Sequence, residues 1–76
     1  MNLMENDQLE PFSAVREAIT AAGGVTATAK YFDVTVSAVY QWAMRGVPPN
    51  RVMALSRLTG DRVSPQEIRP DVFVQD

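Results

Sequence analysis

Polar and aromatic side chains recur on one side of a segment near the middle of the chain. Tyr40 and Gln41 follow Ser37 by three and four residues, and Val36 precedes it. On a helix, this spacing places side chains on one face. Glutamine can pair bidentately with adenine, serine can hydrogen-bond either class of base, and tyrosine or valine can contact a thymine methyl group. The chemistry that these residues support is recognition of base edges in duplex DNA.

A second set of residues could hold the phosphate groups on either side of that helix. Lys30 and Arg45 flank the segment, and Arg51 follows shortly after it. Thr26 begins the preceding helix, where its amide and hydroxyl could bind a phosphate, and Thr35 begins the helix itself. We therefore predict these five residues as phosphate contacts. For each of the three basic residues, the alternative is an ordinary solvated side chain.

Two short helices joined by a turn, between about residues 25 and 45, must position these groups. Ala29, Val34, Val39 and Trp42 have the spacing of a helix-turn-helix. In that geometry Ala29 lies where the helices touch, Val34 fills the turn, and Val39 and Trp42 face the core. Thr35 is a natural N-cap for the second helix. Trp42 is thus predicted as a core residue rather than a platform for stacked bases.

Apolar spacing and end signals predict three further helices. Gly23-Gly24 and Gly60 can end helices, whereas the prolines at 11, 48 and 49 can begin them. Ser64 and Glu67 have the spacing of a capping box. Helices are expected over about residues 11–22, 26–32, 36–45, 49–59 and 65–68. The predicted fold class is all-α, a compact bundle of five short helices with a short extended C-terminal tail.

The composition argues against an enzyme. The chain has no cysteine and no histidine, which removes thiolate nucleophiles, disulfides, the usual general base and the commonest zinc ligands. We therefore predict no catalytic site, no metal and no cofactor. Neither a signal peptide nor a run of about 18 apolar residues is found, which favours a cytoplasmic protein and excludes a membrane partner. The length allows one domain at most.

The charge is unevenly distributed. A net charge of −2 argues against nucleic-acid binding, which usually needs a basic surface. Residues 13–57, however, carry five bases against two acids, whereas residues 1–12 carry only acids. Residues 1–10 are predicted to form a flexible acidic arm, and residues 11–76 a single domain. A scatter of charges over a solvated surface is the alternative explanation for the basic middle.

Several stretches resemble the YdaS-like branch of Cro-type regulators, which are small helix-turn-helix proteins encoded by prophages. Trp42, the Gly-Val-Pro joint at 46–48 and the Arg-Pro-Asp sequence at 69–71, in this order, are the most specific features. The resemblance covers about residues 12–73. Its matching stretches are 21–24, 26–42, 45–48, 51–52, 58–60 and 68–71.

The resemblance implies a lambda-repressor-like fold that binds operator DNA through the second helix of the motif, often as a dimer. The family is generally described as Cro-like repressors, although some members have been labelled toxins or antitoxins. The chain departs from the family at Asp33, where a glycine is usual. That position often needs a positive φ, which aspartate tolerates less well than glycine.

Two functions remain open after the sequence. The first is a sequence-specific transcriptional repressor of Cro type that acts on double-stranded operator DNA. The second is an antitoxin-like or anti-repressor module that binds a protein partner, through the acidic arm or the C-terminal tail. The apolar residues at 72–74 could mediate a homodimer, and packing back on their own domain is slightly favoured.

Overall fold

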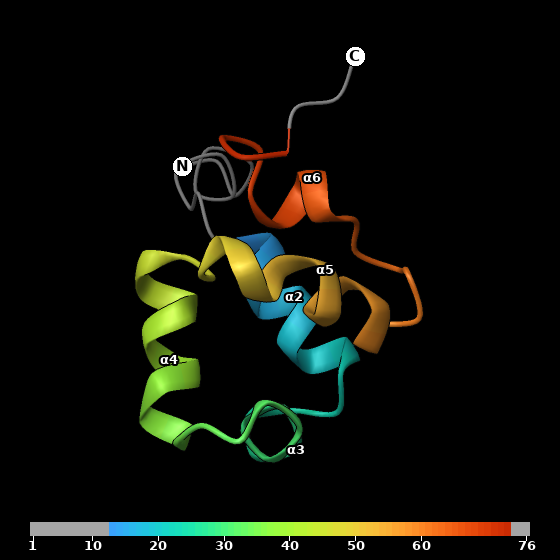
Figure 1. Cartoon of the computed structure of the whole chain (residues 1–76). Coiled ribbons are helices and arrows are strands. Elements are labelled where there is room, and N and C mark those ends of the chain that lie inside the picture. Colours follow the sequence, from blue (N-terminus) through green and yellow to red (C-terminus); the bar gives the residue numbers. More distant parts are fainter. Residues whose placement is uncertain (1–12, 74–76) are drawn as a thin grey trace, which may run out of the picture.

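The computed structural model describes residues 13–73, and every regular element in that part of the chain is a helix (Figure 1). The predicted all-α bundle is therefore confirmed. The predicted arm at residues 1–10 and the residues at 74–76 lie outside the described residues. The helices are α2 (Ser13–Ala21), α3 (Val25–Phe32), α4 (Val36–Arg45), α5 (Pro49–Leu58) and α6 (Pro65–Ile68).

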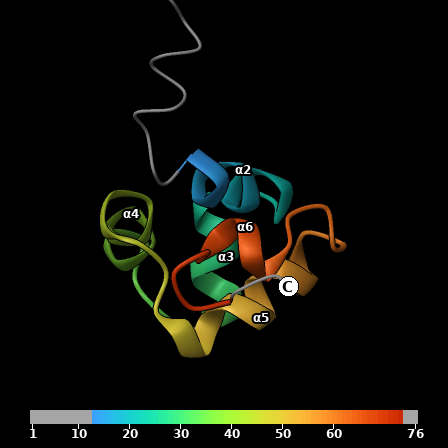
Figure 2. The same cartoon turned by 90° about the horizontal axis from the view of Figure 1, so that it is seen from above.

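Helix α2 contacts each of the other four helices. In Figure 2 it lies at the top of the bundle, with α4 to the left and α3, α5 and α6 below it. All of its buried side chains come from one face, as the helical spacing predicted. The buried apolar core consists of Val15, Ala18, Ile19, Ala29, Phe32, Val39, Trp42, Val47, Val52, Leu55, Val63 and Ile68.

Local end signals fix where the helices begin and end. Gly24 donates its amide to the carbonyl of Ile19 at 2.9 Å, and both Gly23 and Gly24 have positive φ after α2. The capping box predicted for the last helix is present in α6, where the Ser64 hydroxyl and the Glu67 carboxylate each accept a hydrogen bond from the other residue's amide.

The segment after α6 differs from the predicted extended tail as far as Phe73. It forms a turn in which the amides of Val72 and Phe73 both donate to the carbonyl of Arg69, at 3.0 and 2.9 Å. The partly buried Phe73 packs against the core. This side chain therefore packs back on its own domain, which was the favoured alternative, and Val72 is left exposed.

Arg69 ties this turn to the joint between α4 and α5. Its guanidinium donates two hydrogen bonds to the carboxylate of Asp71, at 2.9 and 2.6 Å, and a third to the carbonyl of Val47 at 2.7 Å. The hydrogen bond from Arg69 holds the pKa of the Asp71 carboxyl below its usual value. The Arg-Pro-Asp sequence at 69–71 therefore has a structural role, because Arg69 holds this turn against the joint between α4 and α5.

Candidate nucleic-acid interface

The turn between α3 and α4 is formed by residues 33–35. Asp33 has φ 57° and ψ 48°, in the left-handed region, as expected for this turn position. The amide of Val34 donates to the carbonyl of Ala29 at 3.0 Å, which closes the end of α3. Thr35 is the N-cap of α4, and its hydroxyl oxygen accepts a hydrogen bond from the Ala38 amide at 3.0 Å.

Replacing Asp33 with glycine should raise the free energy of unfolding by about 1 kcal/mol. Glycine adopts a left-handed conformation without a Cβ clash, and the change removes a negative charge from the C-terminus of α3. Urea unfolding followed by circular dichroism measures the effect. Asp61→Gly is the matched control, because Asp61 also has a positive φ, of 64°. A fall in stability for Asp33→Gly alone would mean that this carboxylate supports the turn.

Helix α4 is held to α3 by side chains on its inner face. Val39 is fully buried, and Trp42 is only 6% exposed. The indole meets the ring of Phe32 edge-on, with the ring centroids 5.3 Å apart. The prediction that Trp42 belongs to the core is therefore confirmed. Figure 1 shows α4 along one side of the molecule, with its outer face away from the other helices.

The residues predicted to contact bases are all exposed on α4. Val36 is 40% and Tyr40 57% exposed, and Ser37 and Gln41 are exposed as well. Met44, at 70%, is the most exposed large apolar residue between residues 13 and 73. Because successive helical residues are turned by about 100°, Ser37, Gln41 and Met44 lie opposite Val39 and Trp42. Met44 therefore lies at the centre of this face beside Ser37 and Gln41, an outward position that its sequence spacing also predicts.

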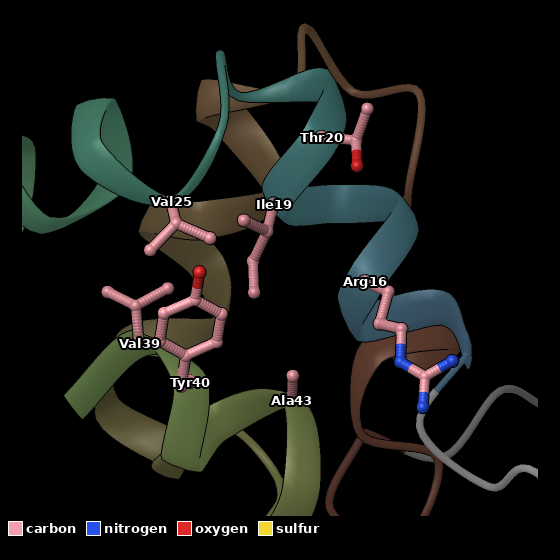
Figure 3. A pocket seen from close by; sticks show the side chains of 7 residues that line it. All are labelled: Arg16, Ile19, Thr20, Val25, Val39, Tyr40 and Ala43. Carbon is pink, nitrogen blue, oxygen red and sulfur yellow. The ribbon is translucent and has the colours of Figure 1, made fainter. Parts of the chain in front are cut away.

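Tyr40 lies at one edge of the face. Together with side chains of α2, the start of α3 and α4, it lines a pocket of about 270 Å³ (Figure 3). Aliphatic groups of Ile19, Val25, Val39 and Ala43 make up much of the wall. The tyrosine therefore lies beside this pocket between α2 and α4 rather than at the centre of the outer face of α4.

The residues predicted to hold phosphates are distributed around α4. Lys30 is in the last turn of α3, close to the turn that leads into α4, and Arg45 is in the last turn of α4. Thr26, Lys30, Thr35 and Arg45 are all exposed. Basic side chains thus stand near both ends of the face, where a duplex lying on α4 would bring its backbones.

Arg51 is the exception among the predicted phosphate contacts. It is only partly exposed, and its guanidinium carbon lies 5.5 Å from the centroid of the Phe32 ring. At this distance the cation interacts with the face of the ring. The contact joins α5 to the same aromatic pair that fixes α4, so Arg51 has a structural role whether or not it also meets a phosphate.

A comparison with protein families connects this arrangement to known sequences. A family model described as "Bacterial toxin YdaS" matches residues 15–76, from within α2 through all the later helices. The chain belongs to this family. The YdaS-like resemblance seen in the sequence is therefore confirmed. No curated protein and no solved structure matches the chain.

Two further observations on this YdaS-family chain concern membrane-spanning helices and metal-binding side chains within residues 13–73. Among the helices of residues 13–73, none combines the length and the apolar character needed to cross a membrane. Within the same range, no three side chains of the His, Cys, Asp or Glu type are grouped so that they could hold a metal ion.

Proposed function

We propose that this chain is a sequence-specific DNA-binding transcriptional repressor of Cro type. In this proposal α3, the turn and α4 act as a helix-turn-helix, and α4 lies in the major groove. The observation that carries the proposal is the outer face of α4. There Ser37 and Gln41 are exposed at the centre of a helix whose other side is fixed by buried Val39 and Trp42. A rigid helix with exposed hydrogen-bonding groups can read base edges.

The proposed contacts divide into two classes. Ser37 and Gln41, with Val36 and Tyr40 beside them, would meet bases and confer sequence preference. Backbone phosphates would be held by the second class, which consists of Thr26, Lys30, Thr35, Arg45 and Arg51, and these would set the position of the protein on the duplex. Repression would follow from occupancy of an operator, so that polymerase or a rival regulator is excluded. This function needs neither a catalytic group nor a cofactor.

The description of the family as a toxin is compatible with this proposal. A DNA-binding protein that occupies promoters stops their transcription without any chemical step. Growth inhibition by this chain, where it occurs, would then require the same α4 residues as DNA binding.

The test is a mobility-shift titration on the DNA upstream of the chain's own gene, compared with a scrambled duplex of equal length. We expect selective binding that weakens as salt is raised, because each neutralised phosphate releases counterions. Contacts by Lys30, Arg45 and Arg51 predict a slope of roughly −3 in log affinity against log salt for each bound chain, at about −0.9 per phosphate. Equal binding to both duplexes, or none to either, would contradict a repressor.

A protein-binding antitoxin-like or anti-repressor module is the second candidate. It is favoured by the exposed apolar side chains of Val36 and Met44 on α4 and by the pocket between α2 and α4 that Tyr40 lines, because such surfaces also accept partner helices. The net charge of −2 points the same way. Binding to a protein with no DNA shift in the titration above would favour this candidate. Sedimentation of the free chain would separately reveal whether it is a homodimer.

A further inference from the structure

We infer that α4 recognises A·T-rich operator DNA chiefly through the 5-methyl groups of thymines, with Val36 and Met44 as the methyl-contacting residues. The inference rests on the proposed function and specifies what its site selects. It starts from the exposed side chains of α4, where Val36 and Met44 stand beside the polar Ser37 and Gln41.

The face is free of the side chains that usually read G·C pairs. Arg45, the last residue of α4, is the one charged side chain in the helix from Val36 to Arg45. Guanine is most often read by arginine or lysine, and cytosine by a carboxylate that accepts from its amino group. Neither type is present along the middle of the face. Discrimination in favour of G·C pairs therefore has no donor or acceptor of the usual kind on this helix before Arg45.

The exposed side chains instead match the major-groove edge of A·T pairs. Val36 is 40% and Met44 70% exposed, so each presents an apolar surface to whatever lies against α4. In the major groove the thymine methyl is the apolar group available to such side chains. Gln41 lies between them in the sequence and can pair with adenine through its amide. All three side chains thus favour the same type of base pair.

The spacing of the two apolar residues fits a short run of base pairs. Val36 and Met44 are eight residues apart, which corresponds to about 12 Å along a helix at 1.5 Å per residue and about 80° around it. Base pairs are stacked at about 3.4 Å, so this length spans three to four of them. We therefore expect the two side chains to contact methyl groups of different base pairs within this run.

The test removes the methyl groups without changing any hydrogen-bonding group. Duplexes that bind the chain are selected from a random pool, and the selected duplex is then made with deoxyuridine in place of every thymidine. Burial of one methyl group is worth about fourfold in affinity. Two contacted methyls therefore predict a loss of about 15-fold for the deoxyuridine duplex.

Protein variants assign the loss to particular side chains. The double variant Val36→Ala with Met44→Ala should bind the thymidine duplex more weakly and should bind both duplexes about equally. Met53→Ala is the matched control because Met53 is also exposed, at 48%, but lies on α5. This control should retain the full sensitivity to deoxyuridine. Circular dichroism of each variant confirms that it is folded.

The outcomes separate this inference from the proposed function. Failure to enrich any duplex would contradict the repressor itself. Enrichment of a sequence that the wild-type chain binds equally well with thymidine or deoxyuridine would leave the repressor in place and overturn methyl recognition. A deoxyuridine effect that persists undiminished in the double variant would overturn the assignment to Val36 and Met44.

Discussion

Replacement of Trp42 by alanine is expected to lower the free energy of unfolding by about 3–5 kcal/mol. The indole is 6% exposed and packs edge-on against Phe32, so its removal leaves a cavity between α3 and α4. Small domains have a net stability of about 5–15 kcal/mol, and the loss would therefore be a large part of the total. Thermal unfolding followed by circular dichroism measures it, since the variant has no tryptophan fluorescence.

Two further variants make this result interpretable. Trp42→Phe keeps an aromatic ring in the site and should lose less stability than Trp42→Ala. Met44→Ala changes an exposed residue of the same helix and should leave the melting temperature nearly unchanged. If Trp42→Ala melted like the wild type but no longer bound DNA, the indole would be a contact residue and the assigned inner face of α4 would be wrong.

Replacement of Gln41 by alanine should weaken binding to the selected duplex by about 1–3 kcal/mol, or roughly 5- to 150-fold. The side chain is exposed at the centre of the outer face of α4, where it has no part in the core. Its loss should therefore leave the unfolding free energy unchanged within about 0.5 kcal/mol. Fluorescence anisotropy with labelled duplex measures the affinity. Gln66→Ala, on α6, is the matched control and should bind like the wild type.

The parts of the fold that short-range signals determine could be predicted from the sequence. Thr35 and Ser64 cap their helices as expected, because an N-cap hydroxyl needs only the amides of the following turn. The left-handed conformation of Asp33 follows from its place between two helices that must turn sharply. The burial of Val39 and Trp42 follows from their spacing on α4.

Features that depend on contacts between distant segments could not be predicted. The turn at residues 70–73 depends on Arg69, whose guanidinium bonds the carbonyl of Val47, 22 residues earlier. The position of Tyr40 beside the pocket depends on where α2 lies against α4. The sequence predicted Arg51 as a phosphate contact, but its guanidinium packs on the Phe32 ring when α5 lies against α3. Hydrophobic periodicity indicates which face of a helix is buried, but not which other helix covers its edge.

The central claim is that α4 reads base sequence while basic residues around it hold the backbone. The most direct measurement is a titration of Gln41→Ala and Lys30→Ala, each against the selected duplex and a scrambled duplex, at one fixed salt concentration. We predict that Gln41→Ala loses affinity for the selected duplex and far less for the scrambled one, because only a base-edge contact carries sequence information. Lys30→Ala should weaken both about equally, as a phosphate contact does. Unchanged selectivity in Gln41→Ala, with wild-type affinity for the selected duplex, would contradict the claim that α4 is the reading helix.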